Sequence, residues 1–390
     1  MRIYALMSRT ICVLVAVVLA CVACSTSRDP AADQTMSPTS HASPAPFEAC
    51  DREERDTLGI IYSDERGRIH QIDIDGSDHR SLELPNGTIV GSPDGRWFAI
   101  EQRSWERGRS SLWLAPSAAP SCITRIARDD RNIIGTAWTR DGDVVVFETP
   151  FTEPLVEGTD EKLVAISADG ARRAVTTLRF GGVYLYRVPA GVSAEGWVYW
   201  SQEIFDGAGG TTGWGRTHLR TGATERFGTG NESFIWEEDW DIAPDAALFA
   251  FIADEHTVMV RTIPTRASRV VYEAASDEYR VVSLSISPTG DRVAIGVRTG
   301  TPDHPRGGRV RLVDLASGRS EMLLDDAAHP ALMPVRWSPD GRYLWVADIV
   351  DLIGEEDVQP AWRDVLLDLL TGERFEPPTG FEAWIAPSAE

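Results

Sequence analysis

The side chains best suited to bind a metal ion are the histidines, and three of the seven lie in polar segments of the C-terminal half. Each has an aspartate close by in the sequence: His256, His304 and His329. Imidazole and carboxylate groups together suit a divalent ion. No short ligand-spacing motif accompanies them, however. We therefore predict no bound metal and no cofactor, and keep these histidines as the candidates for the alternative.

Other chemistry-bearing motifs are missing from the sequence. It contains neither the Gly-x-Ser-x-Gly turn of serine hydrolases nor the His-Glu-x-x-His pattern of zinc proteases. Residues 207–215 are glycine-rich, but no helix that could bind a phosphate is predicted after them. The acidic run 237–241 lacks the sixth-position glycine of a calcium loop, and we interpret it as a solvated strand edge. The sequence thus favours a protein without catalysis, although it leaves the enzyme question open.

Charge and composition narrow the class of partner. The chain of 390 residues has 38 Lys and Arg against 59 Asp and Glu, which gives a formal charge of −21. Binding to nucleic-acid phosphates needs a basic surface, so a nucleic-acid partner is excluded. Hydrophobic residues make up 43% of the chain, as in ordinary globular proteins. We expect a monomer whose partner is a protein or a glycan.

The first 24 residues have the pattern of an export signal. Arg2 and Arg9 are the only charges, residues 11–19 form an apolar run, and small residues with cysteines follow. The run is shorter than the roughly 20 residues of a transmembrane helix. A cysteine after small residues resembles the lipobox of bacterial lipoproteins, in which it becomes the lipidated N-terminus. We prefer Cys24 for this role, with Cys21 as the alternative and a plain signal peptide left open.

The export signal implies a location and an organisation of the chain. With the lipobox, we expect the protein on the outer face of the cell membrane, held there by its lipid anchor alone. Residues 25–50 are rich in Ser, Thr, Pro and Ala and predict a disordered tether. Residues 51–390 form the folded domain. Cys50 and Cys122 are a disulfide candidate, because exported proteins fold under oxidising conditions.

The folded domain repeats one turn motif. Ser-Pro-Asp-Gly stands at 92–95 and again at 338–341, and related turns lie at 139–142, 193–196, 243–246 and 287–290. Proline presets φ, aspartate bonds its own backbone and glycine accepts a positive φ. β-Branched and aromatic residues on both sides predict strands. A second hairpin in each unit, such as 310–324, makes a unit of four antiparallel strands, which is a propeller blade.

The units add up to an all-β, seven-bladed propeller. The first unit, from residue 58 to 84, has three strands and no preceding turn of this kind. Residues 382–388 match the start of a unit and then stop. We therefore predict that the C-terminal strand completes blade one and closes the ring, which hides sheet edges that would otherwise aggregate.

The Ser-Pro-Asp-Gly-Arg turns, and Tyr62-Ser63-Asp64 leading to residues 72–77, resemble the WD40-like propeller repeats of the TolB family. Lipid-anchored propellers of this type are common in high-GC Gram-positive bacteria. The resemblance implies a scaffold for protein or ligand contact. TolB itself has six blades and a separate N-terminal domain, so its Pal-binding role does not carry over. Oligogalacturonate lyases have a histidine-lined propeller mouth with manganese, so a metal-dependent polysaccharide lyase is the alternative.

Loop lengths indicate which end of the ring binds a partner. The loops at one end are short, whereas those at the other are longer: 102–110, 149–161, 203–215, 298–308 and 349–363. Loops on a rigid scaffold often carry function, and aromatic side chains anchor many interfaces. The predicted binding face comprises the aromatic residues of these loops: Trp105, Phe151, Phe205, Trp214 and Trp362.

Overall fold

A computed structural model describes residues 57–63, 68–104, 109–127, 131–139, 141–150, 160–167, 171–179, 185–204, 211–227, 240–243, 247–263, 267–302, 304–327, 329, 332–350, 361–375 and 381–385. The chain divides into two units, Met1–Ala42 and Ser43–Glu390. All described residues belong to the second unit. Among them, no helix is long and apolar enough to cross a membrane.

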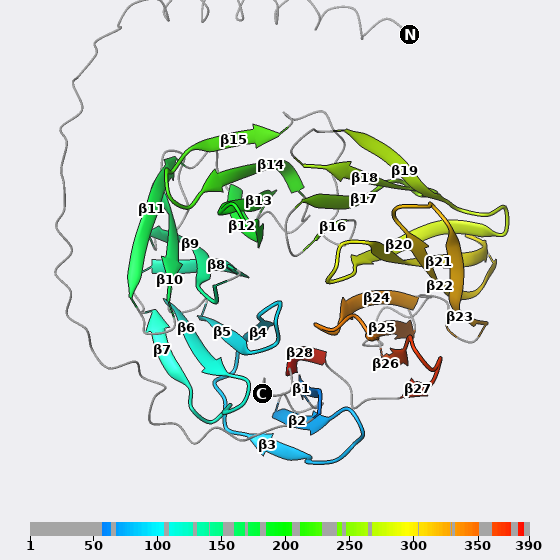
Figure 1. Cartoon of the computed structure of the whole chain (residues 1–390), viewed down its shortest axis with the longest axis horizontal. Coiled ribbons are helices and arrows are strands. Elements are labelled where there is room, and N and C mark those ends of the chain that lie inside the picture. Colours follow the sequence, from blue (N-terminus) through cyan, green and yellow to red (C-terminus); the bar gives the residue numbers. More distant parts are fainter. Residues whose placement is uncertain are drawn as a thin grey trace, which may run out of the picture. The chain divides into compact units, whose positions relative to one another are not determined.

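The described residues form seven antiparallel sheets of four strands each, arranged as the blades of a propeller (Figure 1). From the centre outward, blade one contains β28 (Phe381–Ile385), β1 (Gly59–Ser63), β2 (Ile69–Asp73) and β3 (Arg80–Leu82). Blade two contains β4 (Thr88–Gly91), β5 (Trp97–Ser104), β6 (Arg109–Pro116) and β7 (Thr124–Ala127). Blade three contains β8 (Arg131–Trp138), β9 (Val144–Pro150), β10 (Asp160–Ile166) and β11 (Arg172–Arg179).

The other four blades follow the same order. Blade four contains β12 (Leu185–Val192), β13 (Trp197–Ile204), β14 (Thr211–His218) and β15 (Thr224–Phe227). Blade five contains β16 (Trp240–Ile242), β17 (Leu248–Asp254), β18 (Thr257–Thr262) and β19 (Ser268–Glu273). Blade six contains β20 (Glu278–Ile286), β21 (Arg292–Thr301), β22 (His304–Asp314) and β23 (Ser320–Asp326). Blade seven contains β24 (Leu332–Trp337), β25 (Tyr343–Val350), β26 (Ala361–Asp368) and β27 (Arg374–Phe375).

The repeated turn joins the innermost strand of a blade to the second strand. In blade two the Ser92 hydroxyl donates to the Asp94 carboxylate over 2.6 Å and accepts from the Trp97 N–H over 2.9 Å. Gly95 closes the turn with a φ of 68°, where an L side chain would be strained. The Ser338 hydroxyl accepts from the Tyr343 N–H over 2.8 Å in blade seven. The predicted turn chemistry is confirmed in both copies.

The C-terminal strand closes the ring. β28 pairs antiparallel with β1, so that Gly59 faces Ile385 and Ile60 faces Trp384. Blade one is therefore built from both ends of the folded domain, as Figure 1 shows by the contact between the red β28 and the blue β1. The predicted seven-bladed propeller and its closure are confirmed.

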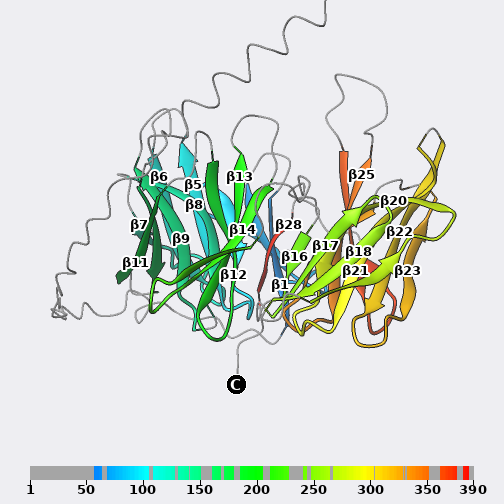
Figure 2. The ribbon, with the colours of Figure 1, turned by 90° about the horizontal axis from the view of Figure 1, so that it is seen from above.

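The hydrophobic core lies between neighbouring blades. One cluster joins Leu112 and Leu114 of blade two to Val144 and Val146 of blade three, and all four side chains are fully buried. The sheet faces thus pack on each other around the ring, while the strands run between its two ends (Figure 2). This packing leaves the innermost strands facing a central channel.

One predicted loop is wrong. Residues 298–308 were expected to form a long connection, but β21 continues to Thr301 and β22 begins at His304. The backbone pairing continues through this segment, with Arg298 opposite Gly308. The glycines at 300, 307 and 308 hid the strand character in the sequence, because glycine normally weakens a strand pattern.

Candidate binding site in the central channel

A cavity of about 1130 Å³ occupies the centre of the ring. All seven innermost strands contribute lining residues, from Thr88 of β4 round to Trp384 of β28. Small-molecule sites in proteins typically measure about 300–1,000 Å³, so the channel is large enough for such a ligand. The cavity is therefore the candidate site with the clearest geometry.

One level of the channel differs in chemistry from blade to blade. Each innermost strand is followed in the sequence by the same type of turn motif, and the third residue before the proline position of that turn marks one level of the channel. All seven residues at this level line the cavity: Val90, Ala137, Gly191, Asp241, Ser285, Arg336 and Trp384. The level thus carries one acid and one base among neutral residues.

Asp241 is held in place by two neighbouring blades. Its Oδ1 accepts the Ile242 N–H of its own strand over 2.8 Å, and its Oδ2 accepts the Ile286 N–H of β20 over 2.7 Å. Burial raises the pKa of this carboxyl to about 6, against the lowering effect of these N–H groups, the Arg336 charge and the Ser285 hydroxyl. The carboxyl is therefore mostly ionised at neutral pH and becomes protonated near pH 6.

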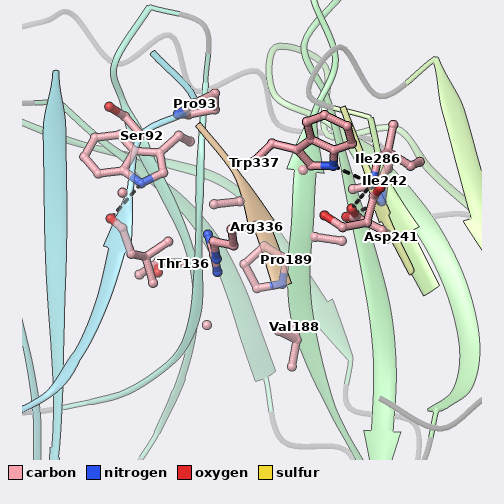
Figure 3. Close-up of a pocket in the computed structure, with 18 of the residues that line it drawn as sticks. Ser92, Pro93, Thr136, Val188, Pro189, Asp241, Ile242, Ile286, Arg336 and Trp337 are labelled. Atoms are coloured by element: carbon pink, nitrogen blue, oxygen red, sulfur yellow. Dashed lines mark hydrogen bonds between the residues drawn. The ribbon is translucent and has the colours of Figure 1, made fainter. Parts of the chain in front are cut away.

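Arg336 brings a permanent positive charge into the same cavity. Its side chain is exposed although it belongs to the innermost strand β24. Figure 3 shows its nitrogen atoms pointing into the cavity, with Thr136 on one side and Asp241 on the other. A guanidinium offers five N–H donors in a planar fork that matches a carboxylate. The channel can therefore bind an anionic group at Arg336.

Three neutral polar residues of the cavity lining bury a polar atom that has no hydrogen-bond partner. Within the described part of the chain, the Ser283 hydroxyl, the Thr136 hydroxyl and the Trp240 indole N–H have no hydrogen-bond partner. The Ser283 residue is only 6% exposed. A buried polar group without a partner is unfavourable by about 1–3 kcal/mol. These three atoms have almost no accessible surface, so the penalty is a cost of the fold and they offer no contact to a ligand in the cavity.

Tryptophans fix the geometry of this level by bonds between blades. The Trp337 indole N–H donates to the Ser285 carbonyl over 3.1 Å, and the Trp138 indole N–H donates to the Val90 carbonyl over 3.2 Å. The peptide unit between Ser285 and Ile286 is thus bonded to blade seven through its carbonyl and to blade five through its N–H. These bonds make the positions of Asp241 and its neighbours rigid.

A second charged cluster lies between blades five and six. The Glu278 carboxylate is fully buried and accepts from the Arg311 guanidinium over 2.6 Å, while Arg309 lies 3.4 Å away. Burial raises the pKa of Glu278, but hydrogen bonds from Tyr272, the Ala275 N–H and Arg311 hold it below its ordinary value. Arg309 also pairs with Asp277 over 2.7 Å and with Asp325 over 3.0 Å. Three acids and two bases thus form a structural ion cluster.

Two of the five predicted binding-face aromatics belong to the described residues, and both lie in strands. Trp105, Phe151 and Phe205 fall outside the described residues. Trp214 lies in β14 and not in a loop, where its ring contacts those of two aromatic residues of blade five: Trp240 at 4.2 Å between centroids and Phe249 at 4.7 Å. Trp362 lies in β26. The binding role of these aromatics stays a prediction.

The three candidate histidines lie on separate connections. His256 is exposed in the turn before β18, His304 is exposed at the start of β22, and His329 lies 3.8 Å from the Asp326 carboxylate after β23. In the described ranges, no three His, Cys, Asp or Glu side chains gather in a way that could hold a metal ion.

The cysteine predictions can be followed only in part. Cys122 forms a disulfide. Cys21, Cys24 and Cys50 lie outside the described residues, as do the export signal and the tether. The pairing of Cys122 with Cys50 and the lipidation of Cys24 therefore stay predictions.

The sequence alone does not single out Asp241 and Arg336 as a pair. Asp241 was interpreted as part of a solvated acidic edge, and Arg336 drew no attention. A signal was available, because both residues stand three positions before the proline of the repeated turn, Pro244 and Pro339. An alignment of the repeats on that turn places them at one level of the ring.

Comparisons with known proteins show the fold. No protein-family model and no curated protein matches this sequence. Among solved structures, a prolyl endopeptidase has a TM-score of 0.54 at 14% identity, over 87% of this chain and 50% of that chain. An oligogalacturonate lyase in complex with manganese has a TM-score of 0.52 at 13% identity, over 83% of this chain and 85% of that one.

TolB from Acinetobacter baumannii has a TM-score of 0.41 at 14% identity, over 72% of this chain and 66% of the TolB chain. The chain thus spans less than two thirds of TolB and half of the endopeptidase. In all, 1078 solved chains match, among them both enzymes and other propellers, so the likeness does not select a function. The protein is a seven-bladed β-propeller that is structurally similar to TolB and to other propellers.

Proposed function

We propose that the protein is a non-catalytic binding module on the outer face of the cell membrane, attached there by a lipid on Cys24. The support for this location is the charged, apolar and small-residue order of residues 1–24 and the lipobox-like cysteine. The Ser-, Thr- and Pro-rich residues 25–50 would serve as the tether between the lipid and the propeller. The partner is an envelope protein or a glycan.

The observation that carries the binding role is the contrast between two positions of the innermost strands. The position just before the Ser/Thr position of the repeated turn is glycine or apolar in all seven blades: Gly91, Trp138, Val192, Ile242, Ile286, Trp337 and Ile385. The position before it lines the channel and carries aspartate, serine, arginine and tryptophan in four of the blades. Packing alone would favour neutral side chains there, because a charge near an apolar core is costly.

A rigid ring suits recognition better than catalysis by moving parts. The closure of blade one, the bonds between blades and the buried cores hold the channel wall in one arrangement. A preorganised surface loses little conformational entropy when it binds. This favours a module that presents a fixed surface to its partner.

The test is crosslinking in the native envelope followed by mass spectrometry. Lys162 is the single lysine of the chain, so amine-reactive reagents would report one position. A carboxyl-reactive reagent uses the 59 Asp and Glu residues instead. We expect crosslinks that concentrate at one end of the ring and join one partner. Crosslinks scattered over the outer strands β3, β7, β11 and β15 would contradict the proposal.

Lipid attachment needs a separate measurement. Labelling of cells with a radioactive fatty acid should mark the protein, and Cys24→Ala should abolish the label and release the protein from the membrane. Cys21→Ala is the matched control and should keep the label. Loss of label in Cys21→Ala alone would move the lipid to Cys21, and an unlabelled wild-type protein would contradict the anchor.

A further inference from the structure

We propose that the central channel binds a small zwitterion of the size of a short peptide, with its carboxylate at Arg336 and its ammonium group at Asp241. This goes beyond the envelope partner, because it assigns a soluble ligand to a site at the axis of the ring. Both side chains line the same cavity at equivalent positions of β24 and β16. No other charged residue stands at that level.

The charges of the channel select against ions of one sign. An anion that pairs with Arg336 also approaches the Asp241 carboxylate, and a cation at Asp241 also approaches the Arg336 guanidinium. Like charges in one cavity repel each other, and Glu101 adds a second carboxylate to the cavity lining that opposes anions. The formal charge of −21 for the whole chain opposes anions further. A zwitterion matches both side chains and brings no net charge.

Two features show that the site is ready to bind. The Asp241 carboxylate is fixed by N–H groups of two blades, and an ionised carboxylate has about four acceptor positions. Its orientation is set before a ligand arrives, while positions for an ammonium group are left. Preorganisation of this kind reduces the entropy lost on binding.

The size of the cavity suits such a ligand. The cavity of about 1130 Å³ leaves room for several residues of peptide.

The experiment uses alanine peptides and the purified full-length chain. Dialanine, trialanine and tetraalanine are titrated at neutral pH by calorimetry, and saturation-transfer NMR detects weak complexes. We expect binding with a preference for one peptide length, because Asp241 is fixed by two hydrogen bonds and Arg336 stands on an innermost strand of the same closed ring. N-acetylated, C-amidated trialanine is the neutral control and should bind at least about tenfold more weakly, since it lacks both charge-assisted contacts.

Variants link the binding to the site. Arg336→Gln should weaken the peptide by about tenfold to a hundredfold, as expected when a hydrogen-bonded charge is lost. Arg319→Gln, at an exposed turn of blade six, is the matched control and should bind like the wild type. Because Arg336 is exposed, its loss should leave the fold intact, which circular dichroism checks.

Three results would overturn the proposal: no binding of any of the three peptides, equal binding of the capped peptide, or unchanged binding by Arg336→Gln. None of them bears on the envelope partner, which the crosslinking experiment tests separately. Equal loss of binding in Arg319→Gln would also overturn it, because that residue lies away from the channel.

Discussion

Asp241→Asn should change how stability depends on pH, and the structure gives the direction. Burial raises the pKa of the carboxyl from its ordinary 3.8 to about 6 in the folded protein. The folded state therefore holds this proton more tightly than the unfolded state. Protonation of Asp241 therefore stabilises the folded state fully below pH 3.8, and this stabilisation is lost as the pH rises through 6. The asparagine variant does not titrate and lacks this loss.

The size of the effect follows from the shift. About two pKa units correspond to about 3 kcal/mol between the two limits. Roughly 2 kcal/mol of this falls between about pH 4.5 and pH 7.5, the range in which the protein can be handled. The asparagine amide also leaves one of the two N–H groups without its acceptor, which destabilises by about 1–3 kcal/mol at every pH. Only the change with pH tests the reasoning.

The assay is urea denaturation of both proteins at several pH values across this range. We expect the unfolding free energy of Asp241→Asn, minus that of the wild type, to rise by about 2 kcal/mol as the pH rises. Asp314→Asn is the control: hydrogen bonds from Ser317 lower the pKa of Asp314, so its titration lies below the range and its difference should stay flat. A flat or falling difference for Asp241→Asn would refute the reasoning.

Three other substitutions have outcomes that the contacts determine. Gly215→Ala places a Cβ 2.2 Å from Cζ2 of Trp200, so calorimetry should show a lower Tm from overpacking of about 1–3 kcal/mol or more; an unchanged Tm would contradict the close contact. Trp337→Phe removes the bond to the Ser285 carbonyl and should destabilise by about 1–3 kcal/mol in urea, whereas equal stability would mean that water replaces the indole. Hydrogen bonds from Arg342 lower the pKa of Asp368 to about 2. Asp368→Asn should therefore be less stable than the wild type above pH 3.8, and this difference should disappear in acid titration as the pH falls from 3.8 to about 2. A difference that persists at the acid end would contradict the ion pair.

The fold could be predicted because local chemistry repeats. The turn at Ser92 needs a hydroxyl, an aspartate and a glycine at fixed positions, and the sequence shows these again at Ser338. The closure by β28 was predictable from an incomplete first unit and a surplus strand at the end. The strand ends around residue 300 were not, because backbone pairing across glycines leaves no side-chain pattern.

The channel site could not be predicted by interpreting each segment of the sequence separately. Asp241 belongs to an acidic run that looks solvated, yet its carboxylate accepts the N–H of Ile286, which is 45 residues away. The exposure of Arg336 depends on the channel, which exists only when seven blades meet. Such features arise from packing between repeats and not from the pattern within one repeat. An alignment of the repeats supplies the missing information.

The proposed binding role is tested most directly by a photo-reactive amino acid placed at single positions in living cells. Met333 lines the channel near the end of the ring at which β24 begins. Leu370 is 77% exposed in the turn between β26 and β27 and serves as the control. The account predicts one envelope partner crosslinked from position 333 and none from position 370. Equal crosslinking from both positions, or from 370 alone, would contradict it.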